Sequence, residues 1–275
     1  MNYLQAIVLG LVQGLAEFLP ISSSGHLVIF KDILGLGEIP LAFDITLHLA
    51  TLLAVVIVFR QRIGRIIAAV WRWIAGKTTG KASGMATAPD AGDENLALVV
   101  PLILATIVTG VMGLLIQKFL PPEGARVASA ELLITAVVLA ATAFIKPGDR
   151  GPARIGKGRA LFIGFAQGLG VFSGISRSGF TIAAGMATGL RRDLAGEFSF
   201  LLSIPAILAA FLLSLKDASG MMANVQAGPL LLASAVAFVS GLAALKLLMR
   251  VVRSGKIAWF ALYLVPVGLA GLFLF

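Results

Sequence analysis

The sequence contains no cysteine, which excludes disulfides, thiol nucleophiles and thiolate metal sites. It has only two histidines in 275 residues, which argues against a histidine-rich zinc site. Charged residues make up 13% of the chain, about half of the roughly 25% found in an ordinary soluble domain. With 59% hydrophobic residues and a mean hydropathy of +0.99, this composition predicts a membrane protein.

The charge that remains is unbalanced, with a net value of +9. In a polar protein this excess would suggest a nucleic-acid partner, but in an apolar chain it is first compared with the positive-inside rule of membrane proteins. No Lys or Arg precedes Lys31, so the apolar start lacks the basic region of a signal peptide. We therefore expect that segment to belong to the folded protein, and we expect no nucleic acid.

Six stretches are long and apolar enough to cross about 30 Å of hydrocarbon, which takes about 20 helical residues. The predicted spans are residues 39–59, 96–116, 127–145, 198–215, 229–245 and 257–275. The segment from Gly76 to Gly92 is rich in small residues and is predicted to be a loop without chemistry. The sequence therefore predicts an all-α polytopic membrane protein with a single domain over residues 1–275.

Two further apolar regions, residues 3–33 and 160–190, are broken near the middle by Gly, Ser and Pro. The 13 residues from Gln13 to Gly25 align without gaps on Gln167 to Gly179, with eight identical pairs. This internal duplication divides the domain into a first repeat over residues 1–145 and a second over residues 160–275.

The broken regions have two interpretations, ordinary spans with a glycine kink or re-entrant helical hairpins with Ser-rich tips inside the membrane. We favour the hairpins, because non-helical backbone at membrane depth requires surrounding protein or a water-filled cavity. Each repeat then has one hairpin and three spans, so the second repeat is inverted relative to the first, as in many transporters.

The positions of the basic residues test this inverted topology. With the linker 60–95 placed in the cytoplasm, 17 of the 22 Lys and Arg residues fall on the cytoplasmic side. Only Lys31, Lys118, Arg126 and Lys216 fall on the opposite side, and Arg177 lies within the membrane. This bias supports the topology and places both termini outside.

Ionisable side chains inside the membrane are costly and by default suggest function. The first hairpin holds Gln13, Glu17 and His26 around the serines Ser22, Ser23 and Ser24, and Gln13 and Glu17 share one helical face. An alternative is that Ser22 or Ser24 caps the next helix. Glu17 could equally be a buried carboxylate hydrogen-bonded to a helix start.

The second hairpin places Arg177 where the first has Ser23, beside Ser176, Ser178 and Thr181. The guanidinium is planar, always charged and suited to phosphate, and a glycine-rich helix start adds anion donors. The alternative is a permanent ion pair between Arg177 and Glu17. Opposed hairpin tips would bring both sets together, and the combined groups match a phosphate better than a sugar, an amino acid or a metal alone.

The chemistry of these groups is that of a hydrolase. Ser23 and His26 are candidates for nucleophile and proton transfer. Glu17 could hold a divalent cation that bridges to a diphosphate. Weaker candidates are His48, either near the site or in a packed hydrogen-bonded pair with Asp44, and Glu197 as a charge at a helix start. We expect Glu131 at a helix interface or the outer boundary.

Both signatures resemble those of the bacterial undecaprenyl-diphosphatases. The segment from Gln13 to His26 is similar to the first, a Glu or Gln, three residues, a Glu, and a Ser-rich stretch ending in Gly-His. The segment from Gly174 to Thr181 is similar to the second, Pro-Gly-x-Ser-Arg-Ser-x-x-Thr. Two residues depart from this pattern: Gln13 replaces a Glu present in many members, and Ser173 replaces the Pro.

The resemblance implies hydrolysis of undecaprenyl diphosphate to the monophosphate and inorganic phosphate, and with it bacitracin resistance. It implies a divalent cation, Mg²⁺ or Ca²⁺, held by Glu17 and Gln13, and action at the outer face of the inner membrane. The catalytic residues it implies are Glu17, Ser23, His26 and Arg177, with Ser23 favoured as nucleophile. The phosphate-binding residues are Ser22, Ser24, Ser176, Arg177, Ser178 and Thr181.

Two alternative functions and the oligomeric state stay open at this point. The inverted architecture also fits a transporter that moves undecaprenyl phosphate with the same site. The departures at Gln13 and Ser173 would fit a lipid-binding protein with weakened catalysis. A homodimer is compatible with the sequence.

Overall fold

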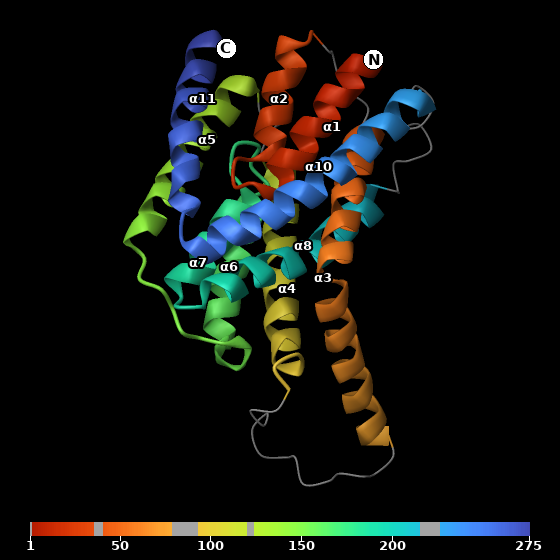
Figure 1. The fold of residues 1–275 in the computed structure, drawn as a ribbon, viewed down its shortest axis with the longest axis vertical. Helices are drawn as coiled ribbons and strands as arrows, with labels where there is room; N and C mark the ends of the chain where they lie inside the picture. Colours follow the sequence, from red (N-terminus) through yellow and green to blue (C-terminus); the bar gives the residue numbers. More distant parts are fainter. Residues whose placement is uncertain (1, 36–40, 79–92, 120–123, 215–225) are drawn as a thin grey trace.

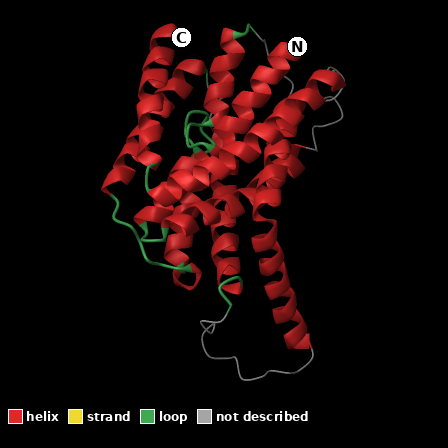
Figure 2. Ribbon diagram, viewed as in Figure 1, coloured by secondary structure: helices red, strands yellow, loops and turns green. Residues whose placement is uncertain are grey.

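The computed structural model describes residues 2–35, 41–78, 93–119, 124–214 and 226–275. Over these ranges the chain is helical, with one isolated bridge between Arg150 and Leu190 and no strand (Figures 1 and 2). Short 3-10 turns precede or follow several of the helices. The helices are α1 (Tyr3–Phe18), α2 (Ser23–Ile33), α3 (Leu41–Thr78), α4 (Val99–Phe119), α5 (Ala125–Ala141), α6 (Lys157–Leu169), α7 (Arg177–Ala187), α8 (Arg192–Ser214), α10 (Ala227–Ser254) and α11 (Phe260–Leu274).

Six helical segments in the described part of the chain are long and apolar enough to cross a membrane, the same number as the predicted spans. They are Phe43–Gly76, Leu96–Phe119, Ala125–Phe144, Arg192–Leu213, Ala227–Ser254 and Ile257–Leu274. The chain is therefore a multi-pass membrane protein.

Helix α3 is much longer than the span predicted for residues 39–59. It continues to Thr78, because Gly64 alone does not stop a helix and no proline follows before that point. Exposed Arg60 and Arg65 lie on this extension, which projects beyond the other helices (Figure 1). The first half of the predicted linker is thus helix, and residues 79–92 and Lys216 lie outside the described residues.

The two broken regions form helical hairpins, α1–α2 and α6–α7. Helix α1 has 16 residues, α6 has 13, and α2 and α7 have 11 each, all below the roughly 20 needed for a full crossing. Pro20 disfavours helical backbone at Leu19 and ends α1. The hairpins come from opposite ends of the molecule and their tips meet near its middle (Figure 1). Their entry into the membrane from opposite sides stays a prediction.

The two repeats interlock through paired glycines. In the first repeat, Gly10 and Gly14 of α1 lie against α10 of the second repeat. At the offset of 154, Gly164 and Gly168 of α6 lie against α4 of the first repeat. A Cβ atom at Gly10 would lie 2.5 Å from the carbonyl oxygen of Ala233, so only glycine permits this approach. Each hairpin is therefore braced by a long helix of the other repeat.

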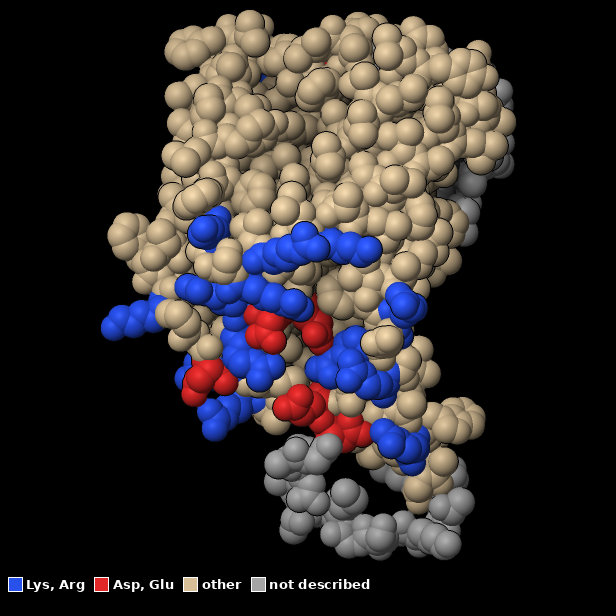
Figure 3. Space-filling view, viewed as in Figure 1, with Lys and Arg blue, Asp and Glu red and all other residues tan. Residues whose placement is uncertain are grey.

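Charged side chains gather at one end of the molecule on the face shown in Figure 3, around the long extension of α3 and the start of α4. The rest of that face is nearly free of them. The two chain ends lie at the opposite end of the molecule (Figure 1). This arrangement agrees with the asymmetry of the basic residues in the sequence.

Candidate active site

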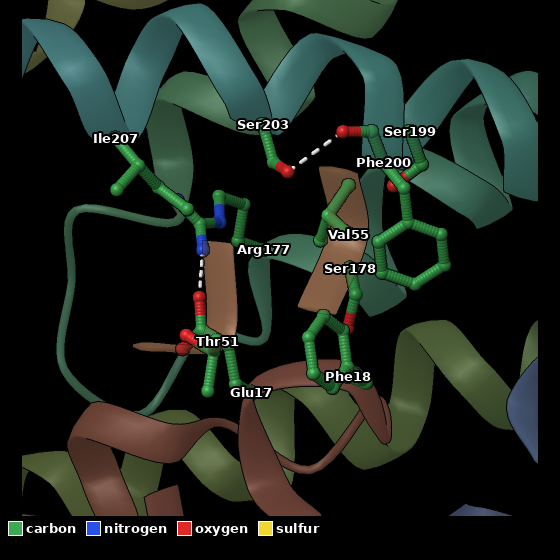
Figure 4. A pocket seen from close by; sticks show the side chains of 10 residues that line it. All are labelled: Glu17, Phe18, Thr51, Val55, Arg177, Ser178, Ser199, Phe200, Ser203 and Ile207. Carbon is green, nitrogen blue, oxygen red and sulfur yellow. Dashed lines mark hydrogen bonds and ion pairs between the residues drawn. The ribbon is translucent and has the colours of Figure 1, made fainter. Parts of the chain in front are cut away.

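The hairpin tips bring together three of the predicted site residues, Glu17, Ser23 and Arg177. Glu17 lies in the last turn of α1 with only 3% of its side chain exposed. One carboxylate oxygen accepts hydrogen bonds from Ser23 Oγ at 2.6 Å and Gln13 Nε2 at 3.1 Å, and the other pairs with Arg177 (Figure 4). The ion pair that the sequence left as an alternative is therefore formed in this structure.

The serines at equivalent places in the repeat cap the second helix of each hairpin. The side chain of Ser22 accepts from the amide of Gly25 at 3.4 Å, and that of Ser176 accepts from Gly179 at 3.1 Å. The capping interpretation is thus confirmed for Ser22. Arg177 is the first residue of α7, so its backbone and side chain lie at the positive end of the helix dipole.

Ser22 and Ser24, both predicted as phosphate ligands, hydrogen-bond to the other hairpin in this structure. Their hydroxyls donate to one acceptor, the carbonyl oxygen of Ser173, at 2.5 and 3.0 Å. This leaves Ser23 as the serine of the first tip whose hydroxyl meets Glu17. In the second tip, the Ser178 hydroxyl lies 3.3 Å from Ser176 Oγ.

Thr181 faces α8, and Glu197 faces α3, rather than the meeting point of the tips. Thr181 Oγ1 donates to the carbonyl oxygen of Arg177 at 2.8 Å and contacts the hydroxyl of Ser199. Glu197, expected as a charge at a helix start, lies inside α8 and pairs with Arg62 at 2.5 Å. The helix begins at Arg192, before Glu197, and Arg192 and Asp193 form its polar first turn.

Two cavities meet at Glu17, Arg177 and Ser178, which line both of them. One is polar, and its further lining includes Ser22, Ser23, Ser24, His48 and Ser176. The other lies between the hairpin tips, α3 and α8, and Figure 4 shows its apolar and hydroxyl side chains around the ion pair. Its further lining is Phe18, Thr51, Val55, Ser199, Phe200, Ser203 and Ile207. A charged head group with an apolar tail would match this combination.

The two histidines are placed differently from what the motif spacing suggests. His26 has both ring nitrogens engaged, Nδ1 with the carbonyl oxygen of Ser22 at 2.8 Å and Nε2 with Tyr263 Oη at 2.9 Å. It lines neither of the two cavities. His48 lines the polar cavity, and its Nε2 lies 3.6 Å from a carboxylate oxygen of Glu17.

The predicted hydrogen-bonded pair of His48 and Asp44 is formed through the backbone of Asp44. His48 Nδ1 contacts the backbone oxygen of Asp44 at 2.9 Å, whereas the Asp44 carboxylate pairs with Lys31 at 2.8 Å. A carbonyl oxygen can only accept, so Nδ1 carries a proton and donates it to this oxygen, while Nε2 faces Glu17. His48 therefore both bonds Asp44 and lies near the site, so the two interpretations of this residue hold together.

A divalent cation has few protein ligands in this region. The described residues contain no cluster of three His, Cys, Asp or Glu side chains that could hold a metal by themselves. Gln13 is fully buried, however, and its Oε1 has no hydrogen-bond partner among the described residues. One carboxylate and one available amide oxygen suit Mg²⁺, which takes few protein ligands and completes its shell with phosphate and water.

Comparison with known proteins fits this arrangement. The family model of the bacitracin resistance protein BacA matches residues 6–270. The chain belongs to the BacA family. An undecaprenyl-diphosphatase of Treponema denticola is 44% identical over 98% of this chain and 96% of its own. Proteins of that name from Desulfatibacillum aliphaticivorans and Mycolicibacterium smegmatis are 42% and 38% identical, each over 98% of this chain and 97% and 95% of their own. These matches give the transporter alternative no support.

In this BacA-family protein the departure at Ser173 preserves the contact between the tips. Ser22 and Ser24 bind the backbone oxygen of Ser173, and a proline at that position would offer the same oxygen. Sequence reasoning also missed the part played by Glu131, whose carboxylate accepts from the amide of Gly174 at 2.7 Å in the second tip. An acid inside a predicted span was the signal that could have found it.

Proposed function

We propose that this chain hydrolyses undecaprenyl diphosphate to undecaprenyl phosphate and inorganic phosphate, and so recycles the lipid carrier of cell-wall synthesis. The observation that carries the proposal is the contact of Ser23 Oγ with Glu17, 2.6 Å long, at the point where Glu17 meets Arg177. A nucleophile, a proton acceptor and an anion-binding guanidinium thus share one site. The relatives named undecaprenyl-diphosphatase supply the substrate.

In the proposed reaction, the terminal phosphate of the lipid takes the place of Glu17 on Arg177. Ser23 Oγ attacks the terminal phosphorus and gives its proton to Glu17, and the bond from that phosphorus to the bridging oxygen breaks. Undecaprenyl phosphate leaves with the proton from Glu17. Water then attacks the phosphorus of the phosphoserine while Glu17 takes a proton from it, and the bond between that phosphorus and Ser23 Oγ breaks. Glu17 gives the proton to Ser23 Oγ, and inorganic phosphate is released.

Glu17 and Gln13 are the residues that would hold the proposed divalent cation. Bound there, the cation would offset the negative charge of the diphosphate oxygens. The unpartnered Oε1 of Gln13 supports this assignment, but the amide nitrogen of Gln13 faces Glu17 in this structure, so the side-chain amide would rotate to bind the cation. Of the two candidate ions, Mg²⁺ suits the small ligand set better than Ca²⁺, which takes six to eight oxygens.

Phosphate release from undecaprenyl diphosphate by the purified protein tests the function. We expect one inorganic phosphate per lipid with Mg²⁺ present, and a loss of at least about tenfold in rate after chelation that added Mg²⁺ restores. An absence of release with either Mg²⁺ or Ca²⁺ would refute the phosphatase. A rate unchanged by chelation would refute only the cation.

We propose that the protein lies in the bacterial inner membrane with both termini outside and the site open to the outer face. The placement of 17 of 22 basic residues on one side supports this orientation. A labelling reporter at residue 85 should be inaccessible in intact cells and labelled after permeabilisation. Labelling in intact cells would show that the orientation is the reverse of the one proposed. The homodimer stays a prediction.

A further inference from the structure

Helix α5 presents two polar side chains to the loop between α6 and α7. Glu131 and Thr135 are four residues apart and therefore lie on one face of the helix. Glu131 Oε2 accepts from the amide of Gly174 at 2.7 Å. Thr135 Oγ1 accepts from the amide of Ser176 at 3.1 Å and donates to the carbonyl oxygen of Gly174 at 2.9 Å. Two side chains thus satisfy three backbone groups of this loop.

Gly174 of this loop is packed too closely against α5 to leave room for water between them. A Cβ atom at Gly174 would lie 2.5 Å from Glu131 Cβ and 2.8 Å from the amide nitrogen of Leu132. Thr135 is fully buried and Glu131 is 9% exposed. Backbone groups in such a place depend on protein partners, because a buried polar group without a hydrogen bond is costly.

The contacts end where the functional helix begins. Ser176 is the N-cap of α7 and Arg177 is its first residue, so the path of the loop sets the direction of the guanidinium. On the opposite side, Ser22 and Ser24 hold the carbonyl oxygen of Ser173. The loop is therefore held between the first hairpin tip and α5. A carboxylate is expensive within an apolar span, and simple packing of α5 does not require one.

We propose that Glu131 and Thr135 are positioning residues for Arg177, acting through the backbone of residues 174–176. The effect on turnover rests on the proposed function, whereas the effect on the loop does not. Misplacing a group that stabilises the transition state by about 1 Å can cost about 100-fold in rate. Because the lipid tail contributes to substrate binding independently of Arg177, kcat is expected to fall more than KM rises.

The test uses the full-length protein in detergent or nanodiscs and two pairs of variants. Glu131→Leu and Thr135→Val remove the acceptors, whereas Glu131→Gln and Thr135→Ser retain an oxygen for the same amides. Ser129→Ala is the matched control, since this buried hydroxyl on α5 donates within its own helix, to Ala125, at 2.7 Å. Each variant is measured for kcat, KM and hydrogen exchange of the amides in residues 173–176.

We expect Glu131→Leu and Thr135→Val to lower kcat at least about tenfold, with KM changed less than about threefold. Loop amides in both should exchange at least about tenfold faster. The two conservative variants and Ser129→Ala should stay near wild type. If Glu131→Leu does not fold, Thr135→Val decides the test.

Wild-type exchange and kcat in Thr135→Val and Glu131→Leu would overturn the inference. So would a Glu131→Gln protein as impaired as Glu131→Leu, because that result would assign the effect to the charge rather than to the hydrogen bond. A wild-type protein without phosphatase activity would refute the proposed function. In that case the exchange measurement would still decide whether these side chains hold the loop.

Discussion

Ser23→Ala is expected to lower phosphate release by about three orders of magnitude or more, the largest effect of any single change at this site. Removing a nucleophile leaves only the binding and electrostatic contributions of the remaining groups. The variant should fold, because Glu17 keeps its contacts with Gln13 and Arg177 and a single lost hydrogen bond costs about 1 kcal/mol. Quenched time-course assays with lipid labelled in its terminal phosphate measure both the rate of phosphate release and the amount of any phosphoprotein.

Ser234→Ala on α10 is a matched control for Ser23→Ala. Its hydroxyl donates to the backbone oxygen of Leu230 at 2.8 Å, within the same helix. It should retain wild-type turnover. A phosphoserine at position 23 in wild type, absent from Ser23→Ala, is the expected labelling result. Full hydrolysis by Ser23→Ala would show that Ser23 is not the nucleophile. Direct attack of water on the phosphorus would then be the remaining mechanism.

Arg177→Lys is expected to lower kcat/KM by about 100-fold, or about 3 kcal/mol of transition-state stabilisation. A lysine keeps the charge and can still pair with Glu17, so the two tips should remain together. It lacks the planar fork that binds two phosphate oxygens at once, and this loss becomes largest as charge develops on the transferred group. Measurements in detergent should therefore show a large loss of turnover but an unchanged midpoint of thermal unfolding.

The control for this variant is Arg250→Lys, an exposed arginine of α10. It makes the same chemical change at a position outside both cavities and should have normal kinetics. Normal kinetics in Arg177→Lys would show that phosphate binding needs only a positive charge, or that Arg177 serves as a structural partner of Glu17. An equal loss of stability and activity would favour the structural role.

The repeat made much of the site predictable. Identical residues at a constant offset of 154, from Gln13 and Gln167 onward, indicated two copies of one hairpin, and the predicted inversion implied that their tips oppose each other. The meeting of Glu17, Ser23 and Arg177 follows from that symmetry. Burial of ionisable groups in apolar segments is costly, which made these residues conspicuous without any structure.

The roles of neighbouring side chains could not be predicted in the same way. Helical spacing places Ser22, Ser23 and Ser24 together, but it does not say which hydroxyl faces Glu17 and which faces the other hairpin. The same limit applies to His26, whose imidazole meets Tyr263 of α11, and to His48, which reaches the polar cavity from α3. These choices depend on packing between helices distant in the sequence.

The sequence alone determined that this is a multi-pass membrane protein with a duplicated motif, and it predicted the inverted topology and the phosphate site, because apolar length, basic asymmetry and paired motifs are local properties of the chain. Only the tertiary structure decided that α3 extends to Thr78, that Ser22 and Ser24 join the hairpins, and that Glu131 supports the loop before Arg177. The physical reason is that a hydrogen bond depends on distances of a few tenths of an ångström between groups up to 237 residues apart. Periodicity specifies the face of a helix, but not the partner that meets it.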